Sequence, residues 1–298
     1  MINNKIKGTG VALITPFNID YSIDYSALKN IIDFTIRGGV DFLVILGTTG
    51  ESPVISIKER NELLAFCKDV IDSRVPIVIG LGGNNTLSLI DEIQSIDLNG
   101  IDAILSVAPY YNKPNQDGIY LHYKLIAENS SLPVILYNVP SRTGVNISSK
   151  TTLRLANDFT NIIAIKEASC DLKQIKDIIK NKPKNFLVLS GDDGLTEKMI
   201  KMGADGVIAV IAQAFPEIFS QMVNMALSKQ YNQSSKLDEG IRKIYSSLYH
   251  DGNPAGIKAT LNILGLCNNI LRPPLTPVSS VVYSDLKELT EIINQTVT

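Results

Sequence analysis

Lys166 is the side chain whose position suggests the most specific chemistry. It ends the run NIIAIK, and strand alternation puts it on the face of Ile162 and Ala164, opposite Ile163 and Ile165. If that face points into a closed sheet, loss of water favours the neutral amine, which is the form that attacks a carbonyl and makes a Schiff base. The alternative is a lysine at a strand end that reaches solvent, and periodicity alone leaves this open.

Tyr137 is the second candidate. It stands two residues after Ile135 in the neighbouring run PVILYN, so both side chains lie on the same face of that strand. Its phenol could therefore point to the same interior, close to Lys166. A phenol both donates and accepts a proton, and imine formation followed by carbon–carbon bond formation needs both steps. A strand tyrosine on its own would more simply be a core residue with a satisfied hydroxyl.

Groups suited to carboxylates occur in two polar loops. Thr48 and Thr49 belong to the loop GTTGES, which can offer hydroxyl and backbone N–H donors to a carboxylate or relay a proton. Arg142, in the loop after Tyr137, offers a planar fork for a second carboxylate. The simpler explanation for Arg142 is a surface salt bridge.

Two adjacent aromatic residues, Tyr110 and Tyr111, stand in the loop PYYNKP. Exposure of both rings to water would be unusual in an isolated monomer. We therefore expect a subunit interface to cover them.

The elements that must position these residues repeat along the chain. Short apolar, β-branched runs alternate with segments of helical spacing, without a break between domains. Eight consecutive strand–helix units predict a closed (β/α)8 barrel, whose active site lies in the loops after the strands. We expect a catalytic barrel over residues 1–228 and a C-terminal helical region over 229–298 that packs on it. The eight runs begin near Val11, Asp41, Val75, Ile101, Pro133, Asn161, Asn185 and Asp205.

Local signals refine this assignment. Ser56 and Glu59 have the spacing of a capping box, and Thr86 and Ser148 stand where helix N-caps are expected. Asp192 and Asp193, together with Glu51, could suggest a site for a hard cation. Capping of the following helix explains the two aspartates more simply, so we expect no metal site.

Composition excludes several classes of function. The 298 residues carry a formal net charge of −2, which provides no broad positive field for nucleic acid. No apolar stretch is long enough for a membrane helix, and three widely spaced cysteines suit a reducing compartment, so we expect a cytoplasmic protein without membrane or nucleic-acid partners. With two histidines, His122 and His250, histidine-based catalysis is disfavoured.

Taken together, the motifs resemble the dihydrodipicolinate synthase family of pyruvate-dependent class I aldolases. The resemblance covers essentially the whole chain through motifs in a fixed order: GVALITP, GTTGES, PYYNKP, YNVPSRTG, IKEAS, SGDD and NPAGIK. It implies the (β/α)8 barrel with a C-terminal helical extension, no cofactor, and the condensation of pyruvate with L-aspartate 4-semialdehyde to 4-hydroxy-tetrahydrodipicolinate in the diaminopimelate and lysine pathway.

The resemblance also implies roles for individual residues. Lys166 would form the imine with pyruvate, and Tyr137 would be the central acid and base. Thr48 and Tyr111 would complete a proton relay, with Tyr111 reaching the neighbouring subunit's site in a homodimer or in a homotetramer made of two dimers. The remaining implied roles concern binding: Thr49 for the pyruvate carboxylate, Arg142 for the semialdehyde carboxylate, and backbone groups at Gly191 and Ile208 for the pocket lining.

One departure from the family concerns regulation. Members inhibited by lysine have a histidine and a glutamate in an effector cleft, where this chain has Ile57 and Ser88, although Ser52, Asn84 and Tyr110 are retained. Without the carboxylate an effector ammonium loses a charge-assisted partner worth about 1.5–3 kcal/mol. We therefore predict weak or absent inhibition by lysine.

Two alternatives remain. N-acetylneuraminate lyase and 2-keto-3-deoxy-sugar-acid aldolases share the lysine, the tyrosine and a similar threonine loop, but they resemble this chain less at Arg142 and at the paired tyrosines. A non-catalytic barrel that binds a keto acid would not need a proton relay.

Overall fold

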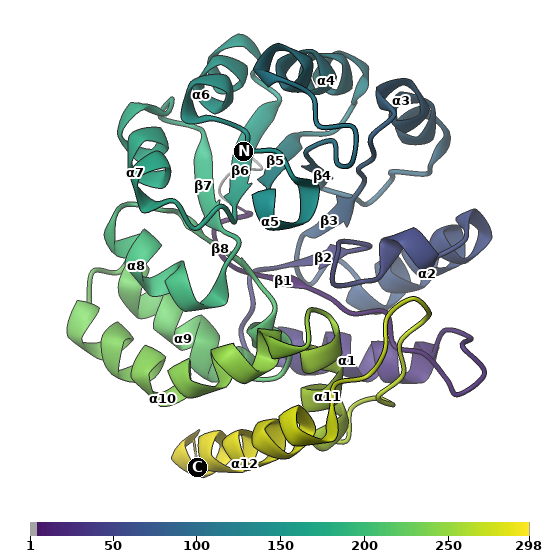
Figure 1. The fold of residues 1–298 in the computed structure, drawn as a ribbon, viewed down its shortest axis with the longest axis vertical. Coiled ribbons are helices and arrows are strands. Elements are labelled where there is room, and N and C mark those ends of the chain that lie inside the picture. The colour runs from purple at the N-terminus through teal and green to yellow at the C-terminus, as the bar shows by residue number, and fades with distance from the viewer. Residues whose placement is uncertain (1–4, 298) are drawn as a thin grey trace.

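Eight parallel strands form a closed barrel in which each strand pairs with the next and the last pairs with the first. The computed structural model describes residues 5–297. Helices surround the barrel, and the C-terminal helices lie together against one side of it (Figure 1). The predicted (β/α)8 barrel with a C-terminal helical extension is confirmed. The strands are β1 (Gly8–Ala12), β2 (Phe42–Ile45), β3 (Ile77–Gly80), β4 (Ala103–Val107), β5 (Val134–Asn138), β6 (Ile162–Glu167), β7 (Leu187–Ser190) and β8 (Gly206–Ala209).

The helices follow the strands in the predicted alternation. Around the barrel they are α1 (Tyr25–Arg37), α2 (Ile57–Ile71), α3 (Thr86–Ser95), α4 (Gln116–Asn129), the short α5 (Pro140–Thr143), α6 (Ser149–Asp158), α7 (Leu172–Asn181), α8 (Thr196–Lys201) and α9 (Pro216–Leu227). The C-terminal helices are α10 (Tyr231–His250), α11 (Ala255–Ile263) and α12 (Ser280–Val297). The division into units 1–228 and 229–298 stays a prediction. No helix among residues 5–297 is both long and apolar enough to span a membrane.

The first strand differs from the prediction. It begins at Gly8, three residues before the expected Val11, because the segment GTGVA pairs with β8 despite its glycines. A Cβ on Gly10 would lie 2.2 Å from the ring of Phe42, so glycine is the residue that lets this ring fill the barrel interior. Steric need at this position outweighs the low β-propensity of glycine.

Two apolar layers make up the core. One fills the barrel interior and contains Ala12, Val44, Leu105, Tyr137 and Ala164. The other lies between the strands and the surrounding helices. Alternate strand residues therefore face opposite layers, as expected for a barrel covered by helices.

The alternation on β6 is interrupted at its start. Val134 pairs with Ile162 and Ile135 pairs with Ala164, so the register shifts by one residue and Ile163 is passed over. As a result Ile162 faces the helices and Ile163 faces the interior, which is the reverse of the predicted sides. A bulge adds one residue to a strand and reverses the facing of the residues before it. Ala164 faces the interior as predicted.

Helix starts follow the sequence signals with one exception. Ser56 and Glu59 form the predicted capping box, and Ser148 accepts a hydrogen bond from the Thr151 amide. For α3 the cap is Asn85, whose side chain accepts from the Ser88 amide, and the predicted Thr86 is the first helical residue. Asparagine and threonine are both good caps, so their order in a sequence does not decide between them.

Candidate active site

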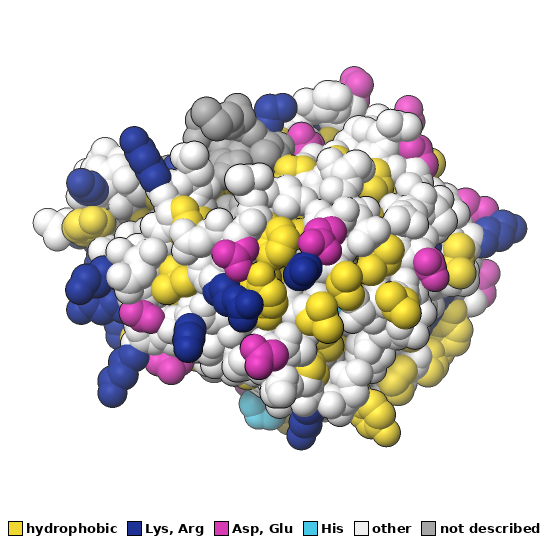
Figure 2. Space-filling view, turned by 90° about the horizontal axis from the view of Figure 1, so that it is seen from above, with side chains coloured by type: hydrophobic (Ala, Val, Ile, Leu, Met, Phe, Trp, Pro, Cys, Tyr) yellow, Lys and Arg dark blue, Asp and Glu magenta, His cyan; other side chains and the backbone are white. Residues whose placement is uncertain are grey.

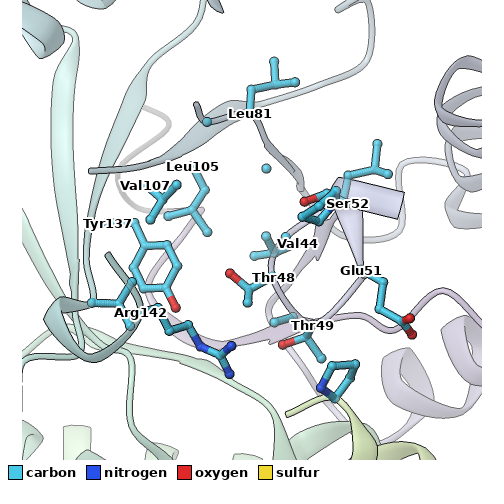
Figure 3. A pocket seen from close by; sticks show the side chains of 18 of the residues that line it. Val44, Thr48, Thr49, Glu51, Ser52, Leu81, Leu105, Val107, Tyr137 and Arg142 are labelled. Atoms are coloured by element: carbon cyan, nitrogen blue, oxygen red, sulfur yellow. The ribbon is translucent and has the colours of Figure 1, made fainter. Parts of the chain in front are cut away.

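A cavity of about 510 Å³ opens where the carboxyl ends of the strands meet the loops. In barrels of this type this is the end at which active sites are built. Five of the predicted catalytic and substrate-binding residues line it: Thr48, Thr49, Tyr137, Arg142 and Lys166. Figure 3 shows the hydroxyl of Tyr137 and the guanidinium of Arg142 on one side of this space and the two threonines on the other.

Lys166 lies inside the barrel. Lys166 is 5% exposed, so the alternative prediction of a strand-end lysine that reaches solvent is wrong. Tyr137 is its partner across β5 and β6, and Lys166 Nζ lies 4.5 Å from the centre of the Tyr137 ring. Gly191 at the end of β7 leaves room for this arrangement, since a Cβ there would lie 3.1 Å from Lys166 Cε. A primary amine and a phenol thus meet in a space with little water.

The turn after β2 presents Thr48 and Thr49 to the cavity. Its backbone closes on itself, because the Gly50 amide donates to the Gly47 carbonyl at 3.0 Å and the Glu51 amide donates to the Thr48 carbonyl at 3.1 Å. Glu51 has φ = 54°, a left-handed conformation that residues other than glycine rarely adopt. The surrounding contacts must therefore hold this turn in place.

Asn253 connects the two groups suited to carboxylates. Its Nδ2 donates to Thr49 Oγ1 at 2.9 Å, and its carbonyl accepts from Arg142 at 3.2 Å. It lines the same cavity, although it is 204 residues from Thr49 in the chain. The sequence offered it only within the motif NPAGIK, and no periodicity marks such a distant contact.

Glu51 and the aspartates after β7 do not form a cation site. Glu51 makes an ion pair with Lys258, and both side chains are fully buried. Asp192 caps the next turn as predicted, accepting from the Leu195 amide. Capping does not explain Asp193, whose carboxylate accepts from the Val210 and Ile211 amides at 3.0 and 2.9 Å and thereby holds the turn after β8. Over residues 5–297, no group of three or more His, Cys, Asp or Glu side chains is placed to hold a metal ion.

Glu167 braces the strand ends from the outside. It follows Lys166 and points the opposite way, where Asn138 Nδ2 donates to its two oxygens at 3.0 and 3.1 Å and the Ser169 amide donates at 2.8 Å. Burial raises the pKa of this carboxyl group, and the hydrogen bonds act in the opposite direction. Asn138 also accepts from the Ile147 amide at 2.9 Å, so the ends of β5 and β6 are tied to the following loop.

Comparison with known proteins identifies the family. The model of the Dihydrodipicolinate synthetase family matches residues 5–294. The chain belongs to this family. A 4-hydroxy-tetrahydrodipicolinate synthase of Parabacteroides distasonis is 49% identical to it over 289 residues, 97% of this chain and 97% of the relative.

Solved structures of dihydrodipicolinate synthases agree over nearly the full length. The enzyme from Aquifex aeolicus matches with a TM-score of 0.93 and 36% identity, covering 97% of this chain and 98% of its own. The chloride-inhibited enzyme from Acinetobacter baumannii, complexed with pyruvate, matches with a TM-score of 0.94 and 36% identity, covering 97% and 99%.

Three residues to which the family resemblance assigns a role do not line the cavity of this single chain. Tyr111 is 88% exposed and has φ = 74°. Ile208 is buried in the barrel interior, and Gly191 contributes by its closeness to Lys166. The loop that carries Tyr111 lies on the surface, so Tyr111 contributes nothing to the cavity of its own chain.

The residues of the family's effector cleft are partly brought together. Ser52 and Tyr110 line the cavity, whereas Asn84 does not. Ile57 is 71% exposed, and Ser88 is exposed as well. The wall beside Ser52 carries Arg60, which is paired with Glu92. The carboxylate at this place is therefore already occupied by a cation of the chain itself.

Proposed function

We propose that the chain condenses pyruvate with L-aspartate 4-semialdehyde through a Schiff base on Lys166, which yields 4-hydroxy-tetrahydrodipicolinate. The observation that carries this proposal is the buried Lys166 amine beside Tyr137 in a cavity that also holds Thr48, Thr49 and Arg142. The family's relatives carry the corresponding enzyme name, and one of them is complexed with pyruvate. The activity is that of a lyase in diaminopimelate and lysine biosynthesis.

The chemistry follows from the order in which protons must move. The neutral Lys166 amine attacks the keto carbon of pyruvate, and loss of water gives an imine. Removal of a methyl proton gives an enamine, whose carbon attacks the aldehyde of the second substrate. The amine of that substrate then displaces Lys166 and closes the ring. Tyr137 would donate and accept these protons, and Thr48 is on the opposite side of the cavity from it (Figure 3).

Two separate groups suit the two carboxylates. The hydroxyl and backbone N–H groups of Thr48 and Thr49 would hold pyruvate near Lys166, and Arg142 would hold the carboxylate of the semialdehyde. Asn253 bonds to both Thr49 and Arg142, which fixes the distance between the two groups. This arrangement suits a small aldehyde with its own carboxylate better than a long sugar acid.

Tyr111 would act in a homodimer or homotetramer by reaching the cavity of a neighbouring copy. Apolar side chains are also exposed on three helices: Ile57 on α2 is 71% exposed, Leu87 on α3 is 68% exposed and Leu121 on α4 is 52% exposed. Figure 2, seen from the side on which α4 and α6 lie, shows apolar side chains gathered between charged ones. A surface of this kind favours association between copies. The cytoplasmic location stays a prediction from the sequence.

Reduction with borohydride in the presence of pyruvate, followed by mass mapping, tests the proposal. The expected product is a stable pyruvate adduct on Lys166, and the Lys166→Ala variant should give none. Lys258 is an internal control, because it is also a buried lysine but lies outside the cavity. An unmodified Lys166 would contradict the mechanism. Turnover with aspartate semialdehyde, compared with cleavage of N-acetylneuraminate and 2-keto-3-deoxygluconate, tests the substrate.

A further inference from the structure

The turn that presents Thr48 and Thr49 is held from behind by the C-terminal part of the chain. Glu51 ends this turn, and Figure 3 shows its side chain directed away from Tyr137 and Arg142. The side chain is fully buried, so its carboxylate must find partners within the protein. Those partners come from residues more than 200 positions further along the chain.

Lys258 supplies the first partner. Its ammonium group pairs with Glu51, donates to the Ile270 carbonyl at 2.9 Å, and lies 4.1 Å from the centre of the Phe17 ring. Burial lowers the pKa of Lys258, while the Glu51 carboxylate acts in the opposite direction. Lys258 itself does not line the cavity, whereas its partner Glu51 does.

Arg272 supplies the second partner. Its backbone N–H donates to the other oxygen of Glu51 at 3.1 Å. Its side chain donates to the Val54 carbonyl at 2.8 Å and pairs with Glu59, so it also holds the segment that follows the turn. One carboxylate oxygen of Glu51 is therefore held by Lys258 on α11, and the other by Arg272 in the segment between α11 and α12.

We propose that Glu51 and Lys258 form a positioning pair for the pyruvate subsite, which fixes the left-handed end of the turn so that Thr48 and Thr49 face Lys166. This inference rests on the proposed function. Neither residue is placed to act on substrate, because the Glu51 side chain points away from the reacting groups and Lys258 is outside the cavity. The C-terminal extension would then determine pyruvate binding, although it supplies neither the amine nor the phenol.

The test separates positioning from stability. The Glu51→Gln variant keeps the shape of the side chain, and the Lys258→Met variant removes the ammonium group alone. The double variant Glu51→Gln/Lys258→Met removes both charges together. Lys182→Met is the matched control, since Lys182 pairs with Asp205 at 3.0 Å at the opposite end of the barrel. For each variant the thermal midpoint, the KM for both substrates and the pyruvate concentration that half-saturates adduct formation at Lys166 are measured.

We expect both Glu51 variants to raise the half-saturating pyruvate concentration about tenfold or more, with a smaller change in the KM for the semialdehyde. We expect the double variant to unfold at a higher temperature than the Lys258→Met single variant, because it leaves no buried charge unpaired. Lys182→Met should lower the thermal midpoint without changing pyruvate binding.

A half-saturating concentration within twofold of the wild-type value in the double variant would overturn the proposal and leave the pair a structural one. If the double variant does not fold, the Glu51→Gln variant decides by the same criterion. Failure of the proposed function would look different, because the wild-type enzyme itself would then give no adduct on Lys166.

Discussion

The turn after β2 and the loop after β4 border the same cavity, but they are held in different ways. Glu51 at the end of the turn has both carboxylate oxygens engaged by buried partners, and Asn253 holds Thr49. The loop after β4 also has left-handed residues, Tyr111 and Lys113, yet Tyr111 is 88% exposed. One side of the site is completed within the chain, and the other presents a surface that a second copy would complete.

Mixed oligomers give the sharpest test of this difference. We expect Thr48→Val, Tyr111→Phe and Tyr137→Phe each to lower kcat by about 10²–10⁴-fold, because each removes a hydroxyl from the proposed relay. Mixing Tyr111→Phe with Tyr137→Phe chains should restore about a quarter of the wild-type activity, since half of the dimers then hold one intact site.

Mixing Thr48→Val with Tyr137→Phe chains is the matched control. Both side chains belong to the cavity of one chain, so no combination of these subunits makes an intact site. Equal recovery in the two mixtures, or none in either, would contradict the different origins that we assign to Thr48 and Tyr111. Activity is measured after unfolding and refolding the mixed chains together.

A second test compares the stability of the two regions. We expect Lys258→Ala to lower the free energy of unfolding by about 3–5 kcal/mol, because it leaves the Glu51 carboxylate buried without its cation. Lys113→Ala in the exposed loop should change it by less than about 0.5 kcal/mol. Denaturant unfolding of both variants checks this, and similar losses would mean that the two regions are held alike.

Acid should weaken the two regions at different pH values. His122 is buried on α4, the helix that follows the exposed loop, and burial lowers its pKa to about 4 from 6.5. The unfolded state then binds a proton more readily than the folded state, so stability is lost as the pH falls from 6.5 to 4, by up to about 3 kcal/mol. We expect His122→Gln to remove this loss, as measured by the free energy of unfolding at pH 7 and pH 5.

The side held by the C-terminal extension should respond only at lower pH. Pairing with Arg272 lowers the pKa of Glu59 to about 2 from 4.5, so its contribution is present above pH 4.5 and lost as the pH falls towards 2. The Glu59→Gln variant should therefore follow the wild-type profile between pH 6.5 and pH 4.5. If this substitution altered the pH dependence of the free energy of unfolding only between pH 6.5 and pH 4.5, the low pKa that we assign to Glu59 would be contradicted.

The smallest expected effect concerns the place where the two regions meet. Ser52 follows the turn, and Tyr110 begins the exposed loop. Because Ile57 and Ser88 provide no carboxylate for an ammonium group and Arg60 is paired with Glu92, lysine should inhibit less than about twofold at millimolar concentration. Steady-state assays with added lysine measure this, and inhibition at micromolar lysine would show that other groups bind it.

Local patterns in the sequence predict much of this structure. Alternation puts Lys166, Ala164, Tyr137 and Ile135 on the interior side, where the structure has them. It fails at Ile162, because a register shift depends on the pairing with β5 and leaves no mark in β6 itself.

Contacts between segments far apart in the chain could not be predicted from the sequence. Local patterns in the sequence indicate only that Glu51 is a polar residue in a loop and that Lys258 is a lysine in a helix. Only the folded chain shows that they are buried against each other. Asp193 likewise reads as a helix cap, because its partners at Val210 and Ile211 come from the next strand's turn. The chemistry of the side chains that line the cavity could be predicted from the sequence. The buried residues that hold the cavity loops in position could not.

The register of β6 after its passed-over residue sets which of two adjacent side chains enters the cavity. Lys166 and Glu167 point in opposite directions, and a slip of one residue in the second half of β6 would exchange them. The barrel would then present a buried acid where it now presents an amine, with no substitution at either position. Which residue serves as the nucleophile therefore depends on the register of the strand as well as on the residue types in it. A single deletion in this strand would alter the cavity more than most substitutions within it.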